Sequence, residues 1–101
     1  MTTIAVMYPA GAGPFDHEYY MATHMPLVRE RWTPMGLTGT TVMRGVPGPD
    51  GSAPPYTVMT LLHFTSMDAF KAAAGAHGRE VMGDIPNFTA AKPIMQFNEE
   101  G

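Results

Sequence analysis

Four short segments of the chain have the apolar pattern expected of β-strands. The first, residues 4–8, is wholly apolar and is followed by Pro9 and a glycine-rich turn, which is typical of a strand buried on both faces. The second, 37–46, is rich in threonine and valine, and the third, 56–64, is apolar on both alternations. Such residues favour extended structure. The fourth predicted strand is 92–97.

A helical pattern fills the segment between the first two strands. Asp16 is a suitable N-cap, because its carboxylate can accept hydrogen bonds from the free amides of a first helical turn. Tyr20 and His24 then lie four residues apart, on one face of a helix that is predicted to end near residue 32. Pro26 lies inside this segment and lacks a backbone donor, so we expect a kink near His24.

A second helix is predicted between the last two strands. Ser66 is its expected N-cap, and residues 84–87 end it. Gly75 and Gly78 weaken the helix by about 1 kcal/mol each relative to alanine, so a bent or two-part helix is expected. Residues 45–55, between the second and third strands, are too rich in glycine and proline for regular structure and are predicted to form a loop.

The order β-α-β-β-α-β predicts one ferredoxin-like α+β domain over residues 1–101, a four-stranded antiparallel sheet with both helices on one face. In the third strand, Val58 and Leu62 point to one face and Met59 and Leu61 to the other. Two helices cover only one of these apolar faces. We therefore expect a second copy of the sheet to cover the other face in a two-fold homodimer. A monomer with the proline-rich loop folded over the sheet is the alternative.

Composition narrows the class of protein. Charged residues make up 15% of the chain, the net charge is −3, and lysine and arginine number six. This does not supply the basic patch that nucleic-acid binding requires. There is no cysteine, which excludes disulfides and thiolate chemistry. No apolar run approaches the ~20 residues that span a bilayer, and the first residues do not resemble a signal peptide. We expect a cytoplasmic protein without membrane or nucleic-acid partners.

Two stretches of the sequence resemble a known family. Residues 15–27 (FDHEYYMATHMPL) resemble the signature of EthD-family proteins, in which a Tyr-Tyr or similar pair is followed by a histidine four residues on and then by x-Pro-Leu. Residues 82–89 (MGDIPNFT) are similar to the second block of the family. The similarity runs over nearly the whole chain in matching order. It implies a dimeric α+β barrel, in which two ferredoxin-like units join their sheets.

The function implied by this resemblance is broad. The family takes its name from a gene cluster for degrading a fuel ether, in which its member is an accessory to a haem monooxygenase system. Members are often called reductases, although the present sequence has no cofactor motif. Related barrels include cofactor-free monooxygenases, lactone isomerases, polyketide cyclases and haem-degrading enzymes. A shared fold therefore leaves the reaction open.

His24 is the first candidate for chemistry, because a histidine titrates near neutrality and can move protons in an apolar pocket. Tyr20, one turn earlier, is its candidate positioning or donor partner, and Asp84 completes the predicted catalytic set. The structural alternative is that His24 caps the backbone groups that Pro26 leaves free.

Four further residues are candidate substrate contacts: Tyr8, Met59, His77 and Asn87. His77 and Asp84 converge only if a glycine bends the second helix; otherwise they are a packed histidine and a helix-end carboxylate. Asn87 is either an amide donor to a substrate oxygen or a turn residue. Met59 belongs to a set of ten methionines, which line an adaptable apolar pocket or simply fill the core.

Other polar residues carry weaker expectations. Arg44 either binds a carboxylate or lies at the sheet edge, and His63 is expected at a wet strand end. His17 and His24 have the wrong spacing for joint metal ligation, and no glycine-rich segment matches a dinucleotide or phosphate loop. We predict no metal and no organic cofactor, with haem bound through His24 or His77 as the alternative.

These observations favour a small cofactor-free enzyme that acts on an apolar, oxygenated ring or ketone. Isomerisation, dehydration or cyclisation would suit it, because each needs proton transfer in a dry cavity. Two alternatives remain open. One is an accessory oxidoreductase component of a degradation pathway, and the other is a non-catalytic protein that binds small apolar molecules.

Overall fold

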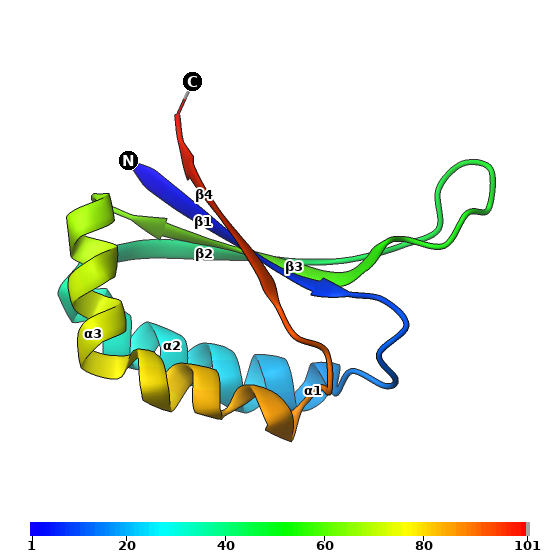
Figure 1. Ribbon diagram of the computed structural model, residues 1–101, viewed down its shortest axis with the longest axis horizontal. Coiled ribbons are helices and arrows are strands. Elements are labelled where there is room, and N and C mark those ends of the chain that lie inside the picture. The colour runs from blue at the N-terminus through cyan, green and yellow to red at the C-terminus, as the bar shows by residue number, and fades with distance from the viewer. Residues whose placement is uncertain (101) are drawn as a thin grey trace.

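The computed structural model describes residues 1–100 and has the predicted order of strands and helices (Figure 1). The strands are β1 (Thr2–Pro9), β2 (Leu37–Arg44), β3 (Tyr56–Phe64) and β4 (Ile94–Glu99). The helical segments are α1 (His17–Tyr19), the π-helical turn η1 (Tyr20–His24), α2 (Met25–Trp32), the 3₁₀ turn η2 (Thr33–Met35), α3 (Met67–Gly83) and the 3₁₀ turn η3 (Ile85–Asn87). None of the helices in this range is long and apolar enough to span a membrane.

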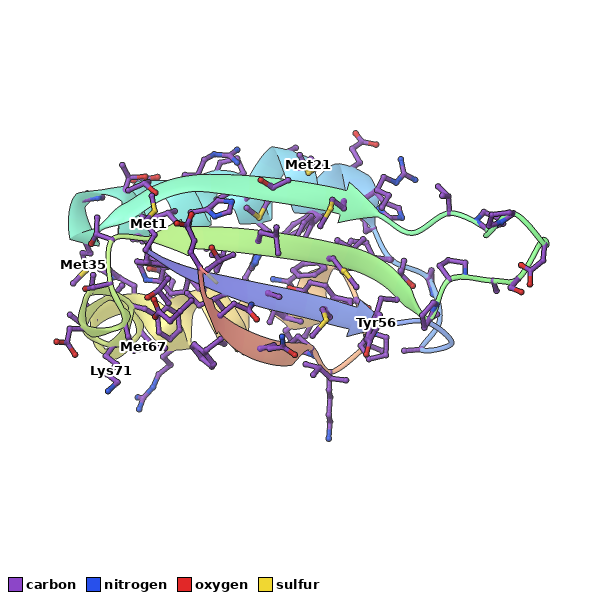
Figure 2. All side chains as sticks on the ribbon, turned by 90° about the horizontal axis from the view of Figure 1, so that it is seen from above. Met1, Met21, Met35, Tyr56, Met67 and Lys71 are labelled. Atoms are coloured by element: carbon purple, nitrogen blue, oxygen red, sulfur yellow. The ribbon has the colours of Figure 1, made fainter. Side chains whose placement is uncertain are left out.

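The sheet is antiparallel throughout, with strand order β2-β3-β1-β4. All the helices lie on one side of it, and the other side carries none (Figure 1). This is the predicted ferredoxin-like α+β arrangement. Figure 2 looks onto the uncovered side of the sheet, with the helices behind it. The face of the sheet that the helices do not cover is called the open face below.

Strand register assigns each side chain to one of the two faces. Ile4 pairs with Leu62 and Val6 with Thr60, and all four are buried under the helices. Their neighbours along the strands, such as Leu61, point to the open face and are only partly buried. The alternation predicted from the sequence is therefore present. The helices cover the face that carries the β-branched and aromatic residues of β1 and β3.

The first helical segment is interrupted where the kink was expected. The backbone N–H of Met25 donates to the carbonyl of Tyr20, five residues earlier, which makes 20–24 a π-helical turn. Pro26 follows directly and has no N–H to continue the regular ladder. The turn inserts an extra residue and keeps both Tyr20 and His24 buried. Asp16 caps the segment through the N–H of Tyr19, as predicted.

The second helical segment, α3, is continuous from Met67 to Gly83, but Figure 1 shows that it bends. The predicted bend is thus confirmed, without a break into two helices. The expected cap is also present, because the Ser66 side chain accepts from the N–H of Ala69. Trp32 joins α2 to α3 by donating its indole N–H to the carbonyl of Ala73 at 2.9 Å. This contact fixes the helix pair over the sheet.

Several predicted strand boundaries are wrong by one or two residues. The first strand is Thr2–Pro9 rather than 4–8, and the last one ends at Glu99 rather than at residue 97. The last strand begins at Ile94 rather than at residue 92, because Pro93 has no N–H to donate and pairing with β1 starts after it. The second strand ends at Arg44 rather than at residue 46. Beyond it, the N–H of Gly45 still donates to Thr57, and the chain then leaves the sheet as a loop.

Gly36 is the turn residue that links the helices to β2, and a substitution there tests how closely this turn packs against α3. Its φ is +109°, and an added Cβ would lie 2.9 Å from the Cβ of Ala69. We expect Gly36→Ala to lower the free energy of unfolding by about 2 kcal/mol, through backbone strain and this clash. Gly75→Ala is the control, because nothing lies within 4 Å of its added Cβ; it should leave stability equal or up to about 1 kcal/mol higher. Urea unfolding at equal protein concentration measures both, and equal values for the two variants would contradict the packing described.

Candidate active site

The carboxylate of Asp84 is the centre of a polar network at one end of the helix layer. His24 Nδ1 lies 2.9 Å from its Oδ2, and the Tyr19 hydroxyl donates to its Oδ1 at 2.6 Å. The side-chain amide of Asn87 donates to the same Oδ1 at 2.9 Å. Three residues, two from the first helical segment and one from η3, thus meet at the carboxylate that ends α3.

Local backbone structure holds Asp84 and Asn87 in place. Asp84 is the residue at which α3 ends, and its N–H still bonds to Val81. The chain then enters η3, where Pro86 stands in the first turn and fixes a helical φ. The backbone N–H of Asn87 donates to the carbonyl of Asp84 at 3.0 Å. The turn therefore brings the Asn87 amide back onto the Asp84 carboxylate.

Asp84 is ionised at neutral pH. Burial alone would raise the pKa of Asp84, but hydrogen bonds from Tyr19, Asn87 and His24 outweigh it and lower the pKa from its ordinary value of 3.8. An ionised carboxylate only accepts hydrogen bonds. His24 must therefore donate from Nδ1, and its other ring nitrogen, Nε2, carries the lone pair.

His24 is held as a neutral imidazole. Burial lowers the pKa of His24 below 6.5, and the Asp84 carboxylate opposes this shift without reversing it. The Tyr20 ring stacks on the imidazole with centroids 5.2 Å apart, and the Phe88 ring lies at 4.7 Å. Nε2 has no hydrogen-bond partner within residues 1–100. Every fully buried side-chain nitrogen or oxygen in this range does have a partner, so Nε2 is not fully buried. Nε2 is therefore not sealed, and it is free to take a proton.

The structural alternative for His24 is not what the structure shows. His24 stands at the N-terminus of α2, but its side chain makes no capping hydrogen bond there. Its Nδ1 is hydrogen-bonded to Asp84, the residue at which α3 ends. The imidazole thus connects two helices rather than satisfying the backbone beside Pro26.

A small cavity lies between the sheet and the helices next to His24. Its volume is about 30 Å³, enough for one or two water molecules and far below the ~300 Å³ of ordinary ligand pockets. Tyr8 and Tyr20 line it, together with Met25, Met82 and Met95. Methionine side chains repack readily. A substrate can therefore reach His24 only if side chains around this cavity move.

Two further predicted site residues, Tyr8 and Tyr20, lie beside His24. Tyr8 and Tyr20 line the cavity with His24, and Tyr20 also bonds to Thr60 at 2.5 Å. Burial raises the pKa of both tyrosines, so they stay protonated donors.

Met59 and His77 lie elsewhere. Met59 is on β3 and points to the open face, because its strand neighbours Val58 and Thr60 point to the helices. His77 is half-buried on α3 and belongs neither to the Asp84 network nor to the cavity lining. The bend in α3 therefore does not bring His77 to Asp84.

Sequence reasoning did not select Tyr19 and Thr60. Tyr19 is adjacent to a stronger candidate, and helical periodicity places it off the buried face. Thr60 carried a usable signal, since it is a polar residue on the otherwise apolar face of β3 that holds Val58 and Leu62. No cluster of three or more histidine, aspartate or glutamate side chains that could hold a metal ion is present among the residues described.

The chain is similar to several proteins of known structure. An EthD-like protein from Ralstonia eutropha JMP134 matches at 37% identity with a TM-score of 0.90, over 97% of this chain and 89% of that one. An EthD family protein from Bacillus halodurans C-125 matches at 23% identity with a TM-score of 0.72, over 100% and 99% of the two chains.

A third structure, of an antibiotic biosynthesis monooxygenase, matches at 9% identity with a TM-score of 0.55, over 100% of this chain and 99% of that one. At these identities the second and third structures show a shared fold only. No family model and no curated protein matches the sequence.

The buried neutral imidazole predicts a pH dependence of stability. Because the pKa of His24 is lower in the folded protein than its ordinary 6.5, the unfolded chain binds the proton first on acidification. The free energy of unfolding should therefore fall as pH drops below about 6.5 and level off beneath the folded-state pKa. His24→Asn keeps an N–H donor for Asp84 but does not titrate, so this slope should become smaller. Urea unfolding between pH 7.5 and 5 measures it, and an unchanged slope in the variant would contradict the assignment. His17, whose pKa is also lowered, accounts for a remaining slope.

Proposed function

The chain belongs to the EthD family, and from that premise we propose that it is a small cytoplasmic enzyme that moves a proton on an apolar, oxygenated small molecule. His24 is the proposed general base and acid, and Asp84 is the residue that orients and stabilises it. The observation that carries this proposal is the bond between His24 Nδ1 and the Asp84 carboxylate, which leaves Nε2 as the basic atom.

The proposed chemistry follows from this tautomer. Nε2 takes a proton from a carbon next to a carbonyl group, and the Asp84 carboxylate stabilises the imidazolium that forms. The imidazolium then returns the proton to another atom of the same molecule. An isomerisation, dehydration or cyclisation of this kind requires only side-chain acids and bases, so it needs no organic cofactor.

The surroundings of His24 support proton transfer. Aromatic rings of Tyr20 and Phe88 enclose the imidazole, and a low-polarity enclosure strengthens interactions with the charges that develop. The protonated hydroxyls of Tyr8 and Tyr20 are candidate donors to the substrate oxygen. Tyr19 and Asn87 are positioning residues that act through Asp84, because they hold its carboxylate in place.

Hydrogen–deuterium exchange tests the proposal without knowledge of the true substrate. 1-Tetralone is an apolar ring ketone whose protons next to the carbonyl exchange slowly with D₂O in buffer. We expect the wild-type protein to accelerate this exchange, measured by proton NMR. His24→Asn should lower the catalysed rate by roughly 10²-fold or more. Asp84→Asn should lower it by at least about tenfold, because the imidazolium loses its counter-charge.

Asp68→Asn is the matched control, since Asp68 is an exposed carboxylate in the first turn of α3; its rate should equal that of the wild type. Equal rates for wild type and His24→Asn would contradict the proposed role. If the wild type does not exchange 1-tetralone but the ketone raises its melting temperature, a non-catalytic binding protein is favoured. If activity appears only with an added flavin, haem or partner, an accessory oxidoreductase component is favoured.

We also propose that the protein is a homodimer that pairs through the open face of the sheet. Met7 pairs with Met59 across β1 and β3, and Met59 pairs with Met43 across β3 and β2. These three thioethers lie side by side next to Leu61, and Met43 is 41% exposed. An apolar surface of this kind usually lies in an interface, and adaptable methionines suit a surface that packs against its own copy.

Leu61→Asp tests the dimer, because Leu61 is on β3, a central strand of the open face, opposite Ala5. We expect the wild type to be a dimer at micromolar concentration and Leu61→Asp to be a folded monomer, measured by native mass spectrometry with circular dichroism. Two buried carboxylates facing each other across a two-fold interface would be strongly unfavourable. Ala72→Asp, on an exposed position of α3, should remain dimeric. A monomeric wild type would overturn this proposal.

A further inference from the structure

Arg44 is a cation with no partner inside the described chain. It is the last residue of β2 and pairs with Val58, a residue of the helix-covered face. Two other arginines have partners: Arg29 donates to the Thr40 hydroxyl, and Arg31 forms an ion pair with Glu80. Arg44 makes no hydrogen bond or ion pair within residues 1–100. Its five donors are therefore available to a ligand.

Arg44 stands at the rim of a surface hollow of about 300 Å³. This volume is ten times that of the inner cavity and reaches the size of small-molecule sites. The lining residues come from the first helical segment and from the end of β2: His17, Glu18, Tyr20, Met21, Val42 and Arg44. The hollow lies on the helix side of the sheet, so a partner on the open face would not cover it.

Tyr20 connects this hollow to the candidate active site. Its side chain is the one that lines both the hollow and the inner cavity. It also contacts the stacked His24 ring and the Thr60 hydroxyl. Met21 forms an apolar rim beside it, is 48% exposed and lies at the outer edge of β2 (Figure 2). Only the Tyr20 ring therefore separates a molecule in the hollow from the His24 imidazole.

Arg44 is the one cation in the lining of the hollow. Burial and the nearby Arg44 cation lower the pKa of His17, and Asp16 opposes this shift. The positive charge of Arg44 thus acts on the imidazole of His17. Glu18 is the one acidic residue of the lining, and it forms no ion pair with Arg44 among the residues described. The guanidinium is left beside an apolar surface formed by Tyr20, Met21 and Val42.

We propose that Arg44 binds the carboxylate of a small molecule whose apolar body lies in the hollow against Tyr20, Met21 and Val42. A guanidinium binds a carboxylate through two parallel hydrogen bonds, which fixes orientation as well as position. The inference rests on the function proposed above and specifies its substrate class, an apolar carboxylic acid. With the carboxylate held at Arg44, the opposite end of the molecule points toward Tyr20 and His24.

Binding of 1-naphthoate and of its neutral analogue 1-naphthamide tests this inference, because the two probes share their shape and differ in charge. NMR titration of the full chain gives both dissociation constants. In the wild type, 1-naphthoate should bind at least about tenfold more tightly than 1-naphthamide, as expected for hydrogen bonds to a charged group. Shifts should be concentrated at Met21 and Val42.

Arg44→Gln should reduce this preference to about one, whereas Arg29→Gln, which removes an exposed cation from α2, should retain it. The inference is overturned if the wild type binds both probes equally or not at all, or if Arg44→Gln keeps the preference. The outcome is separable from the proposed function. His24→Asn should keep the naphthoate preference while losing proton exchange, and a wild type that exchanges protons without the preference would refute the Arg44 assignment alone.

Discussion

The organisation of this protein depends on one partly buried carboxylate, Asp84, which accepts hydrogen bonds from three donors. Desolvation of Asp84 is unfavourable by itself, and the hydrogen bonds from Tyr19, Asn87 and His24 are what lower its pKa and keep it charged. The same bonds join the first helical segment to the end of α3 and decide the tautomer of His24. Loss of the buried His24 donor would remove a hydrogen bond from this carboxylate at the point where the protein covers it most. Structure and proposed chemistry therefore depend on the same atoms.

The two faces of the sheet have different roles. The helix-covered face contributes Tyr8 and Thr60 to the surroundings of Tyr20 and His24, so polar atoms occur there among aromatic and aliphatic side chains. The open face carries Leu61 and a row of methionines and contributes nothing to the Asp84 network. A copy of the sheet packed there would stabilise the strands that hold the site without entering it. The proposed carboxylate anchor at Arg44 lies on the helix side, at the edge of β2, where it stays accessible in such a dimer.

Size is the constraint that links the inner cavity to the surface hollow. A cavity of about 30 Å³ has room for a water molecule but not for an organic substrate. The hollow of about 300 Å³ is large enough for a small organic molecule. Tyr20 borders both and lies in a π-helical turn, a distortion that recurs at functional sites because it displaces side chains from the regular helical register. The extra residue that keeps Tyr20 and His24 together thus also puts Tyr20 between the ligand-sized space and the base.

The sequence by itself determined the elements, because alternation, capping and proline chemistry act between neighbouring residues. Asp16 and Ser66 marked helix starts, Pro26 marked the irregular turn, and the fold order followed. It also identified His24 and Asp84 separately. Their contact joins residues 60 apart in the chain, which local periodicity cannot encode, and so only the tertiary structure brought them together and added Tyr19. Alternation likewise separated Met59 from Val58 without saying which face the helices would cover; the packing of the helices decided that.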